Sequence, residues 1–91
     1  MYEVKFTTAY RKSYMRMLKR GLDVSLLDQV VDRLRQGKAL DAVCRDHALS
    51  GNFAGFRECH IKPDCLPVYL IENDILTLTL VDTGTHADIF Q

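Results

Sequence analysis

The opening MYEVKF has a hydrophobic residue at every second position, which predicts a first β-strand with one apolar and one polar side. The alternation stops at Thr7 and Thr8, either of which is suited to cap the helix that follows. This first helix is predicted to run to about Arg20, and Gly21 is placed to end it.

The next segment has the hydrophobic spacing of a second helix, capped by Asp23 or Ser25 and ended by Gly37. Its hydrophobic residues fall at i, i+1, i+4, i+5 and i+8 and so form one stripe: Leu26, Leu27, Val30, Val31 and Leu34. Because only a few residues separate the two helices, we expect them to pack as an antiparallel hairpin.

The second half of the chain has the spacing of strands and turns. ALDAVCRDH (39–47) is interpreted as a short helix or helical turn, and ALSGN (48–52) as a loop. Three strands are then predicted, with a tight turn at END (72–74) between the last two: FAGFRECHI (53–61), LPVYLI (66–71) and ILTLTLV (75–81).

The predicted fold is α+β, in a single domain over residues 1–91. It consists of an N-terminal strand, an antiparallel helical hairpin, and a three-stranded antiparallel meander with the helices packed on one sheet face. The composition is that of a soluble globular protein, with 47% hydrophobic and 26% charged residues.

The formal net charge is zero, but the charges are unevenly distributed. Residues 1–47 hold 10 Lys/Arg against 6 Asp/Glu, a net +4, and residues 48–91 hold 2 against 6, a net −4. The basic residues of the first part form either a solvated helix face or a surface that attracts phosphate groups. They are Arg11, Lys12, Arg16, Lys19 and Arg20, followed by Arg33, Arg35, Lys38 and Arg45.

The three cysteines, Cys44, Cys59 and Cys65, are an odd number in a chain whose first residues lack the pattern of a signal peptide. No hydrophobic stretch approaches the roughly 20 residues that cross a bilayer. We therefore expect free thiols in a reducing bacterial cytoplasm and no association with a membrane.

The junction ECHIKPDCLPVY (58–69) carries four ionisable residues in place of the Gly and Asn that a simple turn prefers. They are Glu58, His60, Lys62 and Asp64. Strand parity puts Glu58 and His60 on one face. The other two histidines, His47 and His86, lie near predicted strand ends, so all three can converge. The junction is a catalytic site, a metal site or a solvated turn.

A metal site at this junction would take its ligands from Cys59, His60, Cys65 and His86, because zinc is bound by Cys and His. Zinc knuckles commonly space paired ligands by two to four residues, whereas five residues separate Cys59 from Cys65. Parity also directs Cys59 away from His60. We therefore expect no metal and no cofactor.

Three fragments carry a family pattern together: DHALSG (46–51), GFRECHIKPDCLPVY (55–69) and TGTHADIF (83–90). In this order and spacing they resemble the RelE/ParE superfamily of bacterial toxins, specifically its YafQ-like branch. Members usually show Asp-His-x-Leu, then Gly-aromatic-Arg-acid-x-His-(Ile/Val)-x-Pro-Asp, and finally Gly-(Ser/Thr)-His-x-x-(Leu/Ile)-Phe. The resemblance extends over essentially the whole chain.

The resemblance implies the toxin of a type II toxin–antitoxin system. Such a toxin is an endoribonuclease that cuts mRNA in the ribosomal A site and so inhibits translation, and a cognate antitoxin neutralises it in a hetero-oligomeric complex. Carried over position by position, the catalytic residues are His47, Glu58, His60, Asp64 and His86. Phe90 is implied to pack against an RNA base. Arg45, Arg57 and Lys62 are the cations expected to contact the RNA.

Acid/base chemistry suits these residue types. RNA cleavage requires a base for the 2′-hydroxyl proton and an acid for the leaving 5′-oxygen, and an unperturbed imidazole, which titrates near about 6.5, can do either. We assign His86 as the acid and His60, oriented by Asp64 or Glu58, as the base, with His47 assisting or holding phosphate. The sequence leaves the acid and base roles interchangeable.

Two positions depart from the family pattern. The family usually carries an Arg, implied to hold the scissile phosphate, where this chain has Asp82, and several relatives have Trp at the position of Cys65. Two alternatives therefore stay open. One is a catalytically weakened or binding-only protein of the same fold that still binds its antitoxin, or blocks another target as the ParE branch does with gyrase. The other is a zinc-stabilised structural protein.

Overall fold

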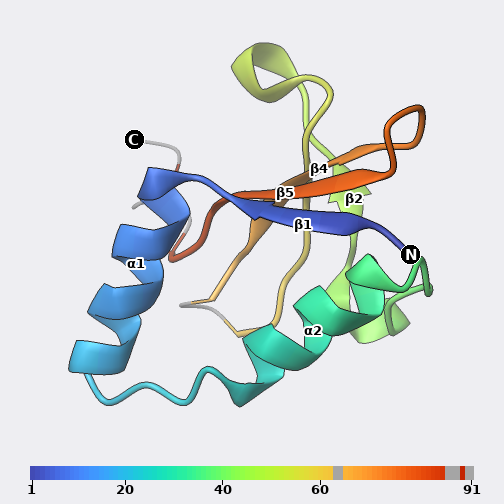
Figure 1. Cartoon of the computed structure of the whole chain (residues 1–91). Helices are drawn as coiled ribbons and strands as arrows, with labels where there is room; N and C mark the ends of the chain where they lie inside the picture. Colours follow the sequence, from blue (N-terminus) through green and yellow to red (C-terminus); the bar gives the residue numbers. More distant parts are fainter. Residues whose placement is uncertain (63–64, 86–88, 90–91) are drawn as a thin grey trace.

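The computed structural model describes residues 1–62, 65–85 and 89 and has the predicted α+β architecture (Figure 1). Helices α1 (Thr8–Lys19) and α2 (Ser25–Arg35) lie on the same side of a five-stranded sheet of order β1-β5-β4-β3-β2. The strands are β1 (Glu3–Phe6), β2 (His47–Ala48), β3 (Arg57–Glu58), β4 (Val68–Glu72) and β5 (Thr77–Asp82). β1 pairs with β5 in parallel, and the other neighbours are antiparallel. No helix in the described part of the chain has the length and apolar character needed to cross a membrane.

Thr7 caps α1, as predicted, and also joins the helix to the sheet. Its hydroxyl oxygen accepts a hydrogen bond from the Tyr10 amide at 3.0 Å and donates to the Val81 carbonyl at 2.5 Å. Val81 is the extra residue of a β-bulge, because Leu80 and Asp82 pair with two consecutive residues of β4. The Thr7 side chain therefore provides hydrogen-bond partners for one backbone amide in the first turn of α1 and for the carbonyl of the bulged residue in β5.

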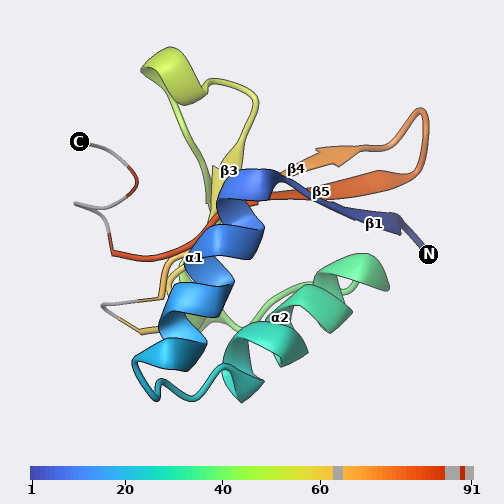
Figure 2. The ribbon, with the colours of Figure 1, turned by 60° about the vertical axis from the view of Figure 1, so that its left-hand side comes forward.

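The second helix begins slightly differently from the prediction. Val24 occupies the cap position without a side-chain bond, and Asp23 accepts a hydrogen bond from the Ser25 amide at 2.9 Å. The two helices diverge from their short connection instead of packing along their length (Figures 1 and 2). The Tyr14 hydroxyl, 3.1 Å from both carboxylate oxygens of Asp28, links them. The predicted helical hairpin is therefore present, but its two helices splay apart from the connecting loop.

The hydrophobic core lies between the helices and one face of the sheet. It combines buried helix residues with buried strand residues: Tyr10, Met17, Leu27, Val30 and Leu34 with Cys59, Cys65, Tyr69, Leu78 and Leu80. The α2 stripe is narrower than predicted, because Leu26 is 43% exposed while Leu27 is fully buried. On β5, Leu78 and Leu80 face the core, as the alternation of Thr and Leu predicts.

The strand predicted over 53–61 is much shorter in the structure. Residues 51–53 form a 3-10 turn, and only Arg57–Glu58 pair as β3. The short helix or helical turn predicted over 39–47 is a 3-10 turn confined to Ala42–Cys44. His47 lies in strand β2, together with Ala48 from the predicted loop 48–52. This extra strand extends the predicted three-stranded meander by one and carries a histidine into the sheet.

Candidate active site

Two short strands bring a carboxylate and two imidazoles together at the edge of the sheet. His47 on β2 pairs directly with Glu58 on β3, and His60 follows two residues later. Oε1 of Glu58 lies 3.1 Å from Nε2 of His60 and 3.8 Å from Nε2 of His47. Glu58 is fully buried, whereas the side chains of His47 and His60 are 47% and 34% exposed. This His–Glu–His cluster (His47, Glu58 and His60) can exchange protons with a bound substrate.

The tautomer of neutral His47 is set by the backbone of Arg45. Nδ1 of His47 lies 2.7 Å from the Arg45 carbonyl oxygen. A carbonyl oxygen only accepts, so Nδ1 carries the donated proton and the Nε2 lone pair is left on the Glu58 side of the ring. Arg45 has φ 50°, a left-handed conformation that is uncommon outside glycine and recurs at functional sites.

His60 is held by the turn before β2. Its amide donates to the Cys44 carbonyl at 2.5 Å, so the chain leaves the β3 ladder at this point. The ring of His60 stacks on that of His47, with centroids 5.6 Å apart and 26° between the planes. The predicted convergence of these two histidines is confirmed, and so is the placement of Glu58 and His60 on one face.

A hydrogen-bonded network beside His47 ties β2 to β3 and β4. Asp46 accepts hydrogen bonds from the Tyr69 hydroxyl and from Nε and Nη2 of Arg57, the latter two at 3.3 and 3.2 Å. Burial, followed by the bond to Asp46, raises the pKa of Tyr69 above its usual value, and the Asp46 bond raises the pKa of Arg57. Sequence reasoning missed Asp46 and Tyr69, although Asp46 directly precedes a candidate histidine.

The two exposed cations predicted to contact RNA lie beside His60. Arg45, Lys62 and His60 line a hollow of about 540 Å³. A second hollow, of about 670 Å³, lies between α2 and residues 39–44 and is also lined by His60. The third predicted cation, Arg57, is paired with Asp46. A phosphate group in the first hollow would therefore meet two cations and an imidazole.

The side chain of Asp82 is hydrogen-bonded to α1. Its Oδ1 accepts hydrogen bonds from the Ser13 hydroxyl at 2.7 Å and from the Thr83 amide at 2.8 Å. Asp82 pairs with Val68, which pairs in turn with Glu58, so about 10 Å separates the backbones of Asp82 and Glu58. The carboxylate is thus bound to a helix and lies two strands away from the His–Glu–His cluster.

Three other predicted site residues, Asp64, His86 and Phe90, lie outside the described residues. Their assigned roles stay predictions that rest on the sequence pattern.

The cysteines are free thiols: Cys59 and Cys65 are buried in the core and Cys44 is half-buried. Among residues 1–62, 65–85 and 89, the group whose donor atoms could surround a metal ion is the His–Glu–His cluster, and neither buried cysteine belongs to it. Cys59 and Cys65 form no such group with His60 among the described residues, and the remaining ligand of the zinc site considered above, His86, lies outside them.

Cys59 is expected to resist alkylation in the folded protein. Burial raises the pKa of its thiol to about 12, so almost no thiolate exists at neutral pH. At pH 8, iodoacetamide should label half-buried Cys44 and should label Cys59 only after unfolding in urea, as peptide mass spectrometry can show. Equal labelling rates for the two residues in the folded protein would contradict the burial.

The same pKa shift predicts a loss of stability in alkali. Because the folded-state pKa of Cys59 lies above the unfolded value of about 8.5, its contribution is fully present below that pH and is lost as pH rises toward about 12. The buried phenols of Tyr10 and Tyr69, whose pKa values are also raised, act in the same direction. Urea denaturation in this pH range measures the combined effect.

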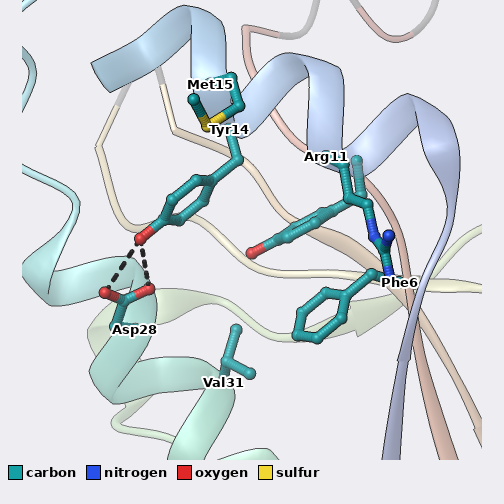
Figure 3. A pocket seen from close by; sticks show the side chains of 7 residues that line it. Phe6, Arg11, Tyr14, Met15, Asp28 and Val31 are labelled. Carbon is teal, nitrogen blue, oxygen red and sulfur yellow. Dashed lines mark hydrogen bonds between the residues drawn. The ribbon is translucent and has the colours of Figure 1, made fainter.

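A separate groove of about 440 Å³ lies between the two helices (Figure 3). It is lined by Phe6, Tyr10, Arg11, Tyr14, Met15, Asp28 and Val31. Burial, and then the bond to Asp28, raises the pKa of Tyr14, and burial raises that of Tyr10, so both phenols are neutral at physiological pH. The groove is bordered by β1, at the opposite edge of the sheet from β2. It has no acid/base pair comparable to the His–Glu–His cluster.

The fold and the clustered imidazoles correspond to a class of small bacterial toxins. A model of the family described as "Bacterial toxin of type II toxin-antitoxin system, YafQ" matches residues 2–91. The chain belongs to the YafQ family of type II toxins. The curated "mRNA interferase toxin YafQ" of Escherichia coli strain K12 is 30% identical over 89 residues, which span 97% of this chain and 95% of the relative.

Solved structures agree with this assignment. A copper-bound mutant toxin from Helicobacter pylori is 38% identical, with a TM-score of 0.92 over 99% of this chain and 100% of the other. A chain of the Escherichia coli DinJ–YafQ toxin–antitoxin complex is 30% identical, with a TM-score of 0.88 over 99% of this chain and 98% of the other.

Proposed function

We propose that this protein is a ribosome-dependent endoribonuclease that cleaves mRNA in the A site by acid/base catalysis and so inhibits translation. The observation that carries the proposal is the buried carboxylate of Glu58 between two reachable imidazoles. The curated relatives, both named mRNA interferase toxins, support the same activity. The protein is proposed to act in the bacterial cytoplasm and to be neutralised by a cognate antitoxin, as the DinJ–YafQ complex suggests by similarity.

The proposed base is His60. If Nε2–H of His60 donates to Glu58, as the 3.1 Å separation allows, Nδ1 becomes the nitrogen that accepts the 2′-hydroxyl proton. Glu58 then holds the ring in one tautomer and stabilises the imidazolium that forms, which is the role of the carboxylate in a Ser-His-Asp triad. His86 is proposed to protonate the leaving 5′-oxygen, with Asp64 as a second orienting carboxylate. No metal ion is needed for these two proton transfers.

The substrate phosphate is proposed to occupy the hollow lined by Arg45, Lys62 and His60. Cations there stabilise the charge that develops on the phosphorane. Arg57, whose charge is paired with that of Asp46, is proposed to contact the RNA, and Phe90 is proposed to stack on a base of the mRNA. The basic residues of α1 and α2 would bind ribosomal RNA by charge.

Asp82 is compatible with activity in this arrangement. Its carboxylate is bound by Ser13 and the Thr83 amide, and two strands separate it from Glu58, so its repulsion of the phosphate is reduced. A phosphate contact supplied by Arg in relatives is nevertheless missing, which favours a rate below that of a protein with Arg at this position.

The enzyme assignment is tested by incubating purified protein with programmed ribosomes and comparing the parent with His86→Ala and Asp82→Arg. We expect the parent to cut, His86→Ala to lose cleavage while still binding the antitoxin, and Asp82→Arg to cut faster because it adds a cation. Full activity of His86→Ala would contradict the assignment of the acid.

The second candidate function is a binding-only toxin-fold protein, which the carboxylate at Asp82 favours. Such a protein would bind ribosomes and antitoxin and leave mRNA intact in the assay above. If only the Asp82→Arg variant cleaves the mRNA, then the histidines of the parent protein form a competent catalytic site that the negative charge of Asp82 inactivates.

A further inference from the structure

We propose that a small hollow between α1 and the loop after β5 binds a phosphate group of the mRNA backbone next to the scissile phosphate. Arg16 and Arg20 would hold this phosphate. They would thereby replace part of the contact that the family pattern implies for an arginine at the position of Asp82. The assignment of the ligand to mRNA rests on the proposed function, whereas the binding of a phosphate group does not.

The hollow has the size and the lining of a site for one small anion. Its volume is about 170 Å³. Pockets that enclose whole small molecules usually measure roughly 300–1,000 Å³, so a single phosphate group suits it better than a nucleobase with its sugar. The polar residues that line it come from α1 with its C-terminal cap and from the loop: Ser13, Arg16, Arg20, Thr83, Gly84 and Thr85.

The two arginines are available to a ligand. Arg16 and Arg20 are four positions apart, so they lie on the same side of α1 and its cap. In the described part of the chain neither guanidinium is in an ion pair, whereas that of Arg57 is paired with Asp46. An arginine presents five N–H donors in a planar fork that matches the oxygens of a phosphate group.

The hydroxyl of Thr83 is an independent observation that points to a ligand. Thr83 is 1% exposed, and its Oγ1 has no hydrogen-bond partner among residues 1–62, 65–85 and 89. Buried side-chain hydroxyls are in the large majority hydrogen-bonded, so this one calls for a partner. Because Thr83 lines the hollow, a phosphate oxygen bound there can accept the hydrogen bond.

The charge balance of the hollow favours a phosphodiester. The carboxylate of Asp82 lies beside it, since Asp82 accepts hydrogen bonds from the Ser13 hydroxyl and the Thr83 amide. One carboxylate against two guanidiniums leaves a net charge of one positive unit. A phosphodiester carries one negative charge and would neutralise the site.

The hollow opens at the end of the sheet that carries the His–Glu–His cluster. One row of register partners crosses four strands at this end: His47, Glu58, Val68 and Asp82. Residues 83–85 continue from the end of this row, and His86, the proposed acid, follows directly in the chain. A phosphate in the hollow would therefore belong to a nucleotide next to the scissile phosphate, which is proposed to lie beside His60.

Binding is tested by NMR titration of the full chain with inorganic phosphate and with a 2′-O-methyl RNA trinucleotide, which lacks the attacking hydroxyl. We expect both ligands to shift the side-chain signals of Arg16 and Arg20 and the amide signal of Thr83. Arg16→Gln, Arg20→Gln and Thr83→Val should each weaken trinucleotide binding by roughly tenfold, because each removes a hydrogen bond to a charged group.

Lys5→Gln is the matched control for the loss of one positive charge, because Lys5 is exposed on β1 and lines no part of the hollow. This variant should bind the trinucleotide like the parent protein. If the three site variants bind it as tightly as Lys5→Gln does, the phosphate site is wrong.

The role in cleavage is tested by single-turnover rates on programmed ribosomes at saturating protein. We expect Arg20→Gln to cut about tenfold more slowly than the parent while co-sedimenting equally with ribosomes. Adding Asp82→Arg to Arg20→Gln should restore much of the rate, because the new cation lies beside the same hollow. Acceleration of the parent and of Arg20→Gln by the same factor would mean that the two positions act independently, which contradicts the replacement.

Two further outcomes separate this site from the proposed function. Slower cleavage by Arg20→Gln that disappears once ribosome binding is saturated would assign the arginine to ribosomal RNA and overturn the mRNA contact. A parent protein that never cleaves contradicts the proposed function, and the titration with inorganic phosphate and the trinucleotide still decides whether the hollow binds phosphate.

Discussion

Glu58→Gln is expected to lower cleavage of ribosome-bound mRNA by about 10²- to 10⁴-fold, the usual contribution of a general acid/base group. The substitution keeps the size of a fully buried side chain and removes the charge that faces the imidazoles of His60 and His47. An amide cannot stabilise an imidazolium as a carboxylate does, and it can also present a donor to Nε2, which reverses the tautomer of His60. Single-turnover rates on programmed ribosomes measure the effect.

Glu72→Gln is the matched control, because Glu72 is a half-exposed glutamate at the far end of β4. The same chemical change there should leave the rate within about twofold of the parent, as for most surface substitutions. Circular dichroism and ribosome co-sedimentation establish whether Glu58→Gln is folded and bound. A folded, bound Glu58→Gln protein that cuts at the parental rate would remove Glu58 from the mechanism.

Leu27→Ala is expected to reduce the free energy of unfolding by about 2–5 kcal/mol. Leu27 is fully buried where α2 packs on the sheet, so the change removes apolar contacts and leaves a cavity in the core. A loss of this size is a large part of the roughly 5–15 kcal/mol that stabilises a typical small domain. Urea denaturation followed by circular dichroism should show a lower midpoint with an unchanged slope.

Leu26→Ala provides the control at the adjacent position of the same helix. Leu26 is 43% exposed, and its truncation should change stability by no more than about 0.5 kcal/mol. Equal destabilisation by the two substitutions would mean that α2 is rotated from its position in the structure. The pair therefore tests which face of α2 is buried.

Long periodic segments explain why most of the fold could be predicted from sequence. Thr7 and Gly21 mark the ends of α1 because capping is local chemistry, and the alternation of Thr and Leu in β5 encodes which side faces the core. Strands β2 and β3 span two residues each, too few to produce a period. The sequence therefore predicts β3 only as part of a longer strand over 53–61 and does not predict β2. The parallel pairing of β1 with β5 likewise joins segments from opposite ends of the chain.

Part of the candidate site could also be predicted from sequence, because some of its residues are close neighbours along the chain. Glu58 and His60 are two residues apart, so strand parity brings them together locally. The approach of His47 depends on β2, and the bond from Tyr69 to Asp46 joins residues that are 23 positions apart. Such contacts are formed by tertiary packing, and no local sequence pattern predicts them.

The most direct test of the proposed function compares one mRNA free in solution with the same mRNA on ribosomes stalled at a defined codon. The 3′ ends produced by the parent protein are mapped in both samples. The account predicts cuts within the A-site codon of the ribosome-bound mRNA and far slower cleavage of the free RNA. Equal cleavage of both samples, or intact mRNA on ribosomes that the protein demonstrably binds, would contradict ribosome-dependent cleavage by this protein.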